Sequence, residues 1–379
     1  MSNSFSFKSK LCNSNFTYQL IKLNQLYMNK KILVTGGAGF IGGNFVLKQI
    51  VETKNEILNF DKLTYAGNLN TLRSIEANER YTFVKGDILD VNQVWDVISS
   101  FSPDAIINFA AESHVDRSID GPMEFLNTNI MGTAVLLETC RKYLEKSPRL
   151  RDTFRFLHVS TDEVYGSLDN EGVFTEETSY DPSSPYSASK ASSDHLVRAW
   201  ERTFNVPTLI TNCSNNYGPY QFPEKLIPLM ILNCLSEKAL PVYGDGKNVR
   251  DWLYVEDHCD AIYSVLKNGN SGDTYNIGGN NEIENIQIIN TICTIMDELK
   301  PRDNGAKYAQ LITYVEDRPG HDFRYAINAS KIKNKLGWEP KENFGTGIKK
   351  TIQWYLENEQ WWEDIQNNTY QQERLGGIS

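Results

Sequence analysis

The sequence predicts an α/β protein, with a doubly wound parallel sheet joined to a smaller lobe of mixed α/β structure. Three observations lead to this fold class. A short apolar strand runs into a glycine-rich turn and a helix, apolar strand-like runs then alternate with helical stretches, and turn-rich segments take over from Asn215 onward. Alternation of this kind is typical of parallel strands with helices on both faces of one sheet.

The first β-α-β unit has the features of a dinucleotide site. Residues 31–35 are an apolar strand, and the turn that follows places glycine at Gly36, Gly39 and Gly42 before a helical stretch. Glycines let the backbone come close to a pyrophosphate, whose charge is met by the N–H groups at the start of the helix. A second strand ends in Asp61, 61 − 42 = 19 residues after Gly42. An acid at this distance is typical of ribose binding, so we expect NAD rather than NADP.

Further apolar runs predict the rest of the sheet, which is therefore of the Rossmann type. These runs are residues 81–84, 105–110, 154–159 and 208–212, and helical stretches at 91–101 and 132–143 lie between them. Right-handed crossovers bring the carboxyl ends of parallel strands to one edge of a sheet, where ligands bind. We therefore expect Asp87, residues 110–113 and residues 160–163 to meet at that edge.

The same pattern divides the chain into parts. Residues 29–212 are the expected NAD-binding Rossmann domain, to which 251–275 return, and residues 213–250 and 276–379 are the expected substrate-binding lobe. Residues 1–28 are rich in Ser, Asn and Lys and lack the apolar core of a secretory signal, so we expect a disordered extension. Translation from Met28 and an organellar leader are alternative interpretations of that segment.

Composition narrows the class of partner. A formal net charge of −10 over 379 residues argues against nucleic acid and against a membrane surface as a partner. No apolar run reaches the ~18 residues of a membrane span. The six cysteines contain no Cys-x-x-Cys pair and the five histidines are dispersed. This usage indicates reduced thiols in a cytoplasmic protein, and no metal site.

Two segments carry the chemistry of a redox site with an added acid–base pair. Thr161, Asp162 and Glu163 place two carboxylates beside a hydroxyl, and Lys190 follows Tyr186 by four residues. On a helix Tyr186 and Lys190 share a face, so we expect the ammonium to favour the phenolate and Tyr186 to act as a base near neutral pH. A polar turn and a solvated helix face are the structural alternatives.

Several segments together carry a resemblance to a known family. They are residues 35–42, 110–118, 160–166, 185–191, 212–219, 222–228, 250–252 and 317–321. With them the chain resembles the extended short-chain dehydrogenase/reductases, and among these the dTDP-glucose 4,6-dehydratases, from about Lys30 to about Trp362. Sugar-nucleotide 4-epimerases share the glycine turn and the Tyr–Lys pair but need no acid–base pair for elimination. Asp162 and Glu163 are therefore the diagnostic residues.

The resemblance implies a lyase that uses bound NAD to oxidise C4 of the sugar, eliminate water across C5 and C6, and reduce C6. Tyr186, helped by Thr161 and Lys190, would take the C4 hydroxyl proton. Glu163 would remove the C5 proton while a protonated Asp162 gives a proton to the departing C6 hydroxyl. Two carboxyl groups with opposite duties need different pKa values.

The resemblance also implies which residues bind the ligands, and a homodimer formed through helices of the nucleotide domain. The expected NAD site consists of Gly36, Gly39, Phe40, Ile41, Gly42, Asp61, Lys62, Leu63, Thr64, Asp87, Ile88, Ala110, Ala111, Thr128, Tyr186, Lys190 and Asn216. The expected sugar-nucleotide site consists of Ser113, Thr161, Asn215, Lys225, Leu226, Pro241, Tyr243, Arg250, Asn285, Arg318 and His321. Its three cations, Lys225, Arg250 and Arg318, suit a diphosphate in an acidic protein.

The chain departs from the family pattern at three positions. Gly43 stands where we expect serine, Gln221 where bacterial relatives have histidine, and Phe323 where we expect arginine. Because Gln221 is similar to plant and viral relatives that act on UDP-glucose, both dTDP-glucose and UDP-glucose stay open as substrates. A UDP-sugar 4-epimerase or decarboxylase, and a non-catalytic NAD-binding protein, are the further alternatives.

Overall fold

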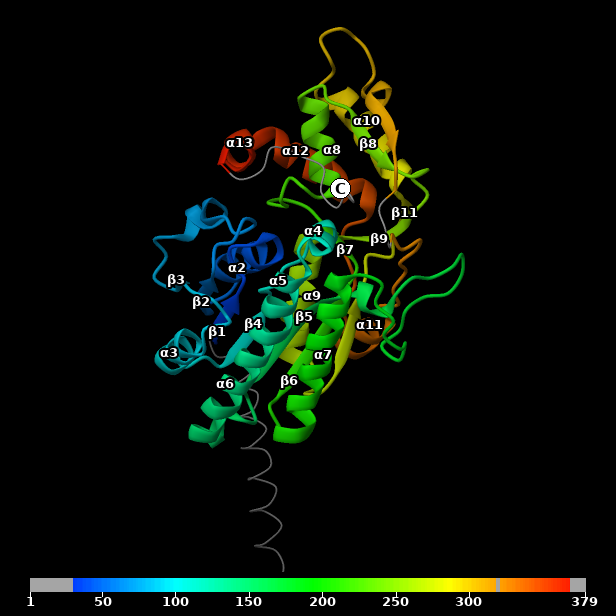
Figure 1. Cartoon of the computed structure of the whole chain (residues 1–379). Helices are drawn as coiled ribbons and strands as arrows, with labels where there is room; N and C mark the ends of the chain where they lie inside the picture. The colour runs from blue at the N-terminus through cyan, green and yellow to red at the C-terminus, as the bar shows by residue number, and fades with distance from the viewer. Residues whose placement is uncertain (1–29, 318–320, 369–379) are drawn as a thin grey trace, which may run out of the picture.

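A seven-stranded sheet forms the centre of the computed structural model, which describes residues 30–317 and 321–368 (Figure 1). The expected extension, residues 1–28, lies outside the described residues. All neighbouring strands pair in parallel, in the order β10-β6-β5-β4-β1-β2-β3, so the predicted doubly wound parallel sheet is confirmed. The strands are β1 (Lys31–Thr35), β2 (Glu56–Asp61), β3 (Tyr81–Lys85), β4 (Ala105–Asn108), β5 (Arg155–Thr161), β6 (Thr208–Cys213) and β10 (Thr274–Ile277).

Helices cover both faces of this sheet. On one face Phe45 of α2 and Ile262 of α9 are buried in the same apolar cluster as Val34 of β1. On the other face Ile98 of α3, with residues of α6 and α7, is buried against the opposite side chains of the strands. These helices are α2 (Phe40–Glu52), α3 (Val91–Phe101), α6 (Thr133–Lys146), α7 (Pro185–Phe204) and α9 (Val255–Asn268).

Helix α7 carries Tyr186 and Lys190, and its start is fixed by its own sequence. The Ser184 hydroxyl accepts the Ser187 N–H at 3.1 Å, and the Ser187 hydroxyl accepts the Ser184 N–H at 3.0 Å. Pro185 has no N–H to leave unsatisfied in the first turn. The cap therefore places Tyr186 in the first turn of the helix.

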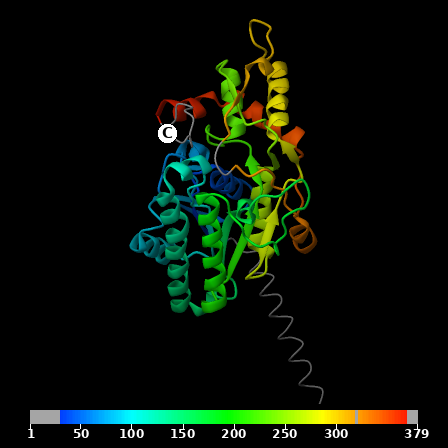
Figure 2. The same cartoon turned by 45° about the vertical axis from the view of Figure 1, so that its right-hand side comes forward.

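The second part of the protein lies beyond one end of the large sheet, as both views show (Figures 1 and 2). Two small sheets, in the orders β11-β9-β7 and β12-β8, pack there with four helices around a separate apolar cluster. The elements are β7 (Asn215–Tyr217), β8 (Leu240–Tyr243), β9 (Val249–Tyr254), β11 (Glu282–Glu284), β12 (Ile312–Val315), α8 (Leu226–Leu235), α10 (Asn285–Leu299), α12 (Phe344–Glu357) and α13 (Glu359–Asn368).

One later segment returns to the large sheet. Helix α11 (Ser330–Leu336) packs on α9 and β10, and Ile332 and Trp338 are buried in the cluster that contains β1. This packing differs from the expectation that all of residues 276–379 belong to the second lobe. The sequence of a short helix shows that one face is apolar, but it does not show which of the two apolar clusters that face will pack against. The division into two lobes otherwise stays a prediction.

Between β4 and α6 the chain forms two short helices and a π-helical turn, a feature common at functional sites. They are α4 (Val115–Asp120), α5 (Pro122–Phe125) and η2 (Leu126–Gly132). Asn129 of η2 holds the loop after β4, since its side chain accepts the Glu112 N–H at 2.9 Å and donates to the Glu112 carbonyl at 3.0 Å. In the described ranges no helix is both long and apolar enough to cross a membrane.

Candidate active site

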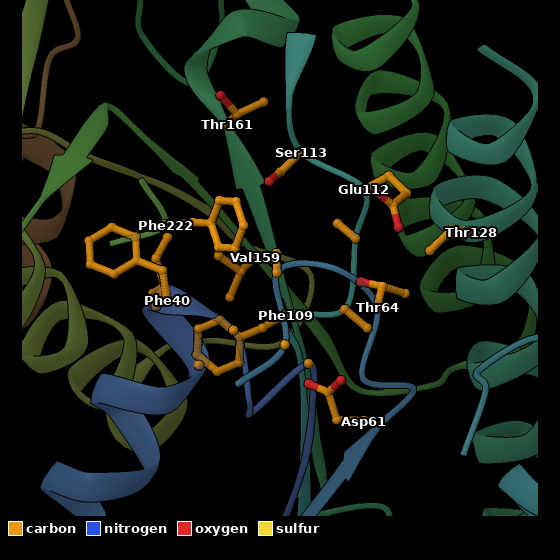
Figure 3. A pocket seen from close by; sticks show the side chains of 18 of the residues that line it. Phe40, Asp61, Thr64, Phe109, Glu112, Ser113, Thr128, Val159, Thr161 and Phe222 are labelled. Atoms are coloured by element: carbon orange, nitrogen blue, oxygen red, sulfur yellow. The ribbon is translucent and has the colours of Figure 1, made fainter. Parts of the chain in front are cut away.

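A cavity of about 300 Å³ lies along the carboxyl edge of the large sheet. Its lining includes residues at or just after the ends of β1 to β6, which are Gly36, Asp61, Asp87, Ala110, Thr161 and Asn215. In the view of Figure 3, Asp61 lies at one end of the cavity and Thr161 and Ser113 lie at the other. The strand ends thus meet at one edge, as the sequence predicts.

Nearly all residues expected to hold NAD line this cavity. The exception is Leu63, whose backbone φ is 57° and whose N–H donates to Asp61 Oδ1 at 2.7 Å. Asp61 Oδ2 accepts the Ala38 N–H at 2.9 Å, so the carboxylate ties the end of β2 to the glycine turn. Burial raises the pKa of Asp61, and these two backbone hydrogen bonds act in the opposite direction.

The glycine turn fits a pyrophosphate for a steric reason. Gly36 has φ +70°, and a Cβ there would lie 2.5 Å from the Ala110 nitrogen. A Cβ on Gly42 would lie 2.3 Å from the Gly36 carbonyl oxygen. Helix α2 begins at this turn, and its N-cap residue Gly39 offers no side chain to satisfy the first N–H groups. Those N–H groups and the helix dipole are suited to a phosphate anion.

The two adjacent carboxylates have different environments. Strand β5 ends at Thr161, and the short helix η4 (Asp162–Tyr165) begins there with the Thr161 hydroxyl accepting the Glu163 N–H at 3.3 Å. Thr161 and Glu163 line the cavity, whereas the side chain of Asp162 is 1% exposed and does not. Burial, with the nearby Glu163 second, raises the pKa of Asp162 well above its ordinary value. Of the two carboxyl groups, Asp162 thus has the environment that favours the protonated form.

Tyr186 lies in the wall of the cavity, hydrogen-bonded to Thr161. Burial, followed by the charge of Glu163, raises the pKa of Tyr186 well above its ordinary value, while the Thr161 hydrogen bond acts in the opposite direction. The expected lowering by Lys190 is not found. Lys190 Nζ donates instead to the Val159 carbonyl at 2.8 Å. Burial lowers the pKa of Lys190 to about 8.

The expected sugar-nucleotide residues fall into two groups. Ser113, Thr161, Asn215 and Lys225 line the cavity, and Lys225 Nζ donates to the Ser113 carbonyl at 3.1 Å. The others lie on the second part of the protein: Leu226 begins α8, Pro241 and Tyr243 are on β8, Arg250 is on β9, and Asn285 begins α10. Arg318 lies outside the described residues.

Two of these outer residues organise the segment that follows Arg318. The Arg250 guanidinium donates to the carbonyls of Asp322 and Phe323, at 2.8 and 3.2 Å. The rings of Tyr243 and His321 lie 6.4 Å apart, edge to face. The side-chain oxygens of Asn215 and Asn285 are buried and have no partner among the described residues. Unsatisfied buried acceptors of this kind suit a polar ligand.

Sequence reasoning missed an ion pair between a half-buried arginine, Arg117, and a buried glutamate that lines the cavity, Glu224. Arg117 Nε donates to Glu224 Oε2 at 2.9 Å, and its guanidinium lies 3.9 Å from the centre of the Tyr65 ring. The Tyr65 hydroxyl donates to Glu224 Oε1 at 3.1 Å. Arg117 and Glu224 both stand in segments that carry the family resemblance, but a pairing across 107 positions leaves no local signal.

A further carboxylate in the cavity wall was also missed. Glu112 lines the cavity, and burial, with the charge of Glu124 second, raises its pKa to about 7. The side chains of Glu112 and Thr128 face the same region in Figure 3. Glu112 lies in a loop after a strand, a common position for a glutamate, so its sequence context does not predict the raised pKa.

Comparison with known sequences gives one family. The sequence model described as GDP-mannose 4,6 dehydratase matches residues 33–351. A dTDP-glucose 4,6-dehydratase of Escherichia coli is 59% identical over 359 residues, which cover 91% of this chain and 99% of the relative. One from Neisseria meningitidis is 57% identical over 351 residues, covering 92% of this chain and 99% of the relative.

Solved structures give the same result. The dTDP-glucose 4,6-dehydratase of Bacillus anthracis, in complex with NAD, has a TM-score of 0.78 and 49% identity, and the match covers 89% of this chain and 99% of that one. The enzyme of Streptomyces venezuelae, with NAD and TDP bound, has a TM-score of 0.81 and 44% identity, covering 88% and 99%. A UDP-glucose 4-epimerase of Thermotoga maritima, with UDP-glucose, is also similar, at a TM-score of 0.76 and 28% identity over 87% and 99%.

Proposed function

This chain belongs to the dTDP-glucose 4,6-dehydratase family, and on that premise we propose that it converts dTDP-glucose to dTDP-4-keto-6-deoxyglucose as an NAD-dependent lyase. The observation that carries the proposal is the contrast between Asp162, which is buried and has a raised pKa, and Glu163, which lines the cavity. A 4-epimerase needs no such pair. The dehydratase reaction needs one acid and one base at neighbouring carbon atoms.

NAD, when bound, supplies the group that accepts the C4 hydrogen with its electron pair and returns it to C6. The residues that would hold it are the glycine turn, through the N–H groups at the start of α2, and Asp61, through the ribose hydroxyls. Asp61 also favours NAD over NADP, because a carboxylate repels a 2′-phosphate. Position 61 holds no arginine, whose guanidinium would bind the 2′-phosphate of NADP.

The chain's own residues then move the protons. Tyr186 would take the proton of the C4 hydroxyl once the positive charge of bound NAD+ offsets the burial that raises its pKa, with Thr161 hydrogen-bonded to the phenol and Lys190 on the same helix face. The 4-keto group acidifies the C5–H bond, and Glu163 removes that proton from the cavity side. Asp162 gives its proton to the departing C6 hydroxyl, which leaves as water. Glu163 returns a proton to C5 after C6 is reduced.

The identity of the base is the finer part of the proposal. The relatives at 55–59% identity named as dTDP-glucose enzymes support dTDP-glucose. UDP-glucose with the same chemistry is the alternative that Gln221 raised. Gln221 donates to the Asn216 carbonyl at 2.8 Å and lines the cavity. Its buried side-chain oxygen has no partner among the described residues, so it is available to a ligand.

The test is product analysis in heavy water. The protein is incubated separately with dTDP-glucose and UDP-glucose in D₂O, and the product is examined by NMR. We expect a 4-keto-6-deoxy sugar that carries deuterium at C5, formed faster from dTDP-glucose. Recovery of a galactose epimer, or of both substrates unchanged, would refute the dehydratase assignment. A faster reaction with UDP-glucose would leave the chemistry in place and correct the nucleotide.

We also propose that the protein acts as a cytoplasmic homodimer. Five free cysteines among the described residues are all buried, which suits a reducing compartment. Met123 of α5 and Met131 of η2 are 63% and 54% exposed, so the helices of the nucleotide domain present apolar side chains to a partner copy. Light scattering of the purified protein tests the dimer, and a monomeric mass at micromolar concentration contradicts it.

A further inference from the structure

One face of α7 carries four polar residues at intervals of four. Tyr186, Lys190, Asp194 and Arg198 follow one another along the helix, so their side chains form a row. The proposed function uses Tyr186 and Lys190 and leaves the other two without a role. Asp194 is 0% exposed and does not line the cavity. A carboxylate buried to this degree needs a counter-charge or several hydrogen-bond donors.

Asp194 has donors on one of its oxygens. Its Oδ2 accepts from the Tyr180 hydroxyl at 2.8 Å, the Ser160 hydroxyl at 3.0 Å and the Asn212 amide at 3.3 Å. Arg198, the next residue in the row, donates to the Tyr180 hydroxyl oxygen at 2.7 Å. Burial raises the pKa of Asp194, while Lys190, these donors and Arg198 act in the opposite direction and favour the ionised carboxylate. Because the group is buried, its charge is weakly screened and acts strongly on its neighbours.

The other oxygen of Asp194 points toward His158 and Lys190. Asp194 Oδ1 lies 3.5 Å from His158 Nε2, and Lys190 Nζ lies 3.4 Å from the same ring nitrogen. Burial, with the charge of Lys190 second, holds the pKa of His158 well below its usual range. His158 is therefore neutral. It separates Lys190 from Asp194 without supplying a charge to either.

Lys190 is surrounded by groups that carry no negative charge, apart from Asp194. Strand β5 presents His158 and the Val159 carbonyl, α7 presents Tyr186 and Asp194, and β6 presents the Cys213 thiol. Burial raises the pKa of Cys213, so the thiol stays protonated. Burial lowers the pKa of Lys190, and Asp194 is the largest opposing influence.

We propose that Asp194 is a positioning residue for the reaction: it is the buried counter-charge that keeps Lys190 protonated beside Tyr186, and Tyr180 and Arg198 keep Asp194 ionised. The inference rests on the proposed function, since the charge of Lys190 affects the reaction only if Tyr186 takes the C4 hydroxyl proton. Asp194 touches neither substrate nor cofactor. Its effect on the reaction therefore passes through Lys190 and depends on pH.

The test compares the holoenzyme with its Asp194→Asn variant between about pH 6 and about pH 9. In the variant Lys190 loses its proton at lower pH, so the alkaline limb of the kcat profile should move down by about 1–2 pH units. KM for dTDP-glucose and the NAD content should not change. Asp194→Glu should return the limb toward its original position, and Glu201→Gln, which removes an acid from the same helix, should leave it in place. An equal loss of kcat at every pH overturns the inference.

A second measurement needs no turnover and separates this inference from the proposed function. The difference in thermal unfolding midpoint between wild type and Asp194→Asn should narrow as the pH rises from about 6 to about 8 and stay constant above that, because Lys190 of the variant releases its proton at a lower pH than Lys190 of the wild type. A packing role predicts a constant difference, which would overturn the inference even if the wild type converted neither sugar nucleotide.

If Asp194→Asn does not fold, two milder variants decide the question. Tyr180→Phe removes a donor to Asp194, and Arg198→Gln removes the cation behind that donor. Both substitutions make the ionised form of Asp194 less favourable while the Asp194 side chain itself stays in place. Each should move the alkaline limb in the same direction by a smaller amount. An unchanged limb in both variants overturns the inference.

Discussion

Asp162 and Glu163 are neighbours in sequence, yet only Glu163 faces the cavity, while Asp162 lies beneath it at 1% exposure. The turn into η4 produces this difference, because strand β5 ends at Thr161 and the next two side chains leave the chain in different directions. Burial raises the pKa of Asp162, and access to the cavity suits Glu163 to the role of base that we propose for it. Two identical functional groups can take opposite roles when their environments differ in this way.

Glu163→Gln should block elimination and keep C4 oxidation. The amide cannot remove the C5 proton, so overall turnover should fall by ~10²–10⁴. The reduced cofactor should then accumulate in a single turnover, seen by its near-ultraviolet absorbance. Glu171→Gln, in an exposed loop, is the matched control and should behave as wild type. Equal loss of oxidation and elimination would remove Glu163 from its assigned role.

Asp162→Asn should slow elimination by ~10² or more, because an amide is not a proton donor of the needed acidity. Its effect on stability has a definite sign. The raised pKa of Asp162 favours folding at low pH, and this contribution is lost as the pH rises through the pKa of the folded state. The variant is neutral at every pH, so its unfolding midpoint should gain on that of wild type as the pH rises from about 4 to the pKa of Asp162 in the folded state. Parallel midpoint curves would contradict a protonated Asp162.

Gly42→Ala should produce protein without bound NAD. Its Cβ would lie 2.3 Å from the Gly36 carbonyl oxygen, and two backbones cannot separate without opening the turn. Gly43→Ala is the control, since the atom nearest its Cβ would be the Thr71 methyl group at 3.0 Å, on a side chain that can shift, and the nearest backbone atom, the Gly37 carbonyl oxygen, would lie 3.6 Å away. Cofactor content after acid extraction measures both. Retention of NAD by Gly42→Ala would show that the turn does not carry the pyrophosphate.

Local patterns explain why so much of the fold could be predicted. Each strand of residues 31–213 is a short apolar run between turn residues, and the glycine turn, Asp61 and Tyr186 stand at spacings fixed by one strand or one helix. The side of the sheet to which α11 returns could not be predicted, because it depends on which core is left uncovered. The same limit applies to Lys190 and Asp194: their spacing of four on α7 places them on one face, but the burial that would make Asp194 its counter-charge has no signal in the sequence.

The pair of Arg117 and Glu224 leads to a prediction about the wall of the cavity. Glu224 is 2% exposed at its side chain and comes from the loop before α8, whereas Arg117 comes from α4 in the nucleotide domain. Arg117→Ala leaves that buried carboxylate with only the Tyr65 hydroxyl at 3.1 Å and His114 Nε2 at 3.9 Å, so the free energy of unfolding should fall by about 2 kcal/mol. Without Arg117, the loop that carries Glu224 should also hold Tyr65 less firmly in the cavity wall. A loss of about 2–3 kcal/mol in the attachment of this loop would let NAD dissociate at least ~10-fold faster.

Arg141→Ala is the control that separates burial from ion pairing. Arg141 pairs with Glu138 at 2.7 Å on the surface of α6, where water screens the charges, so its loss should cost no more than ~1 kcal/mol. Chemical denaturation gives both free energies, and dilution of the holoenzyme into an NAD-free buffer gives both dissociation rates. If Arg117→Ala and Arg141→Ala behave alike, the ion pair of Arg117 and Glu224 does not fasten the two parts of the protein. If Arg117→Ala loses stability but keeps its NAD, the pair supports the fold and not the cofactor site.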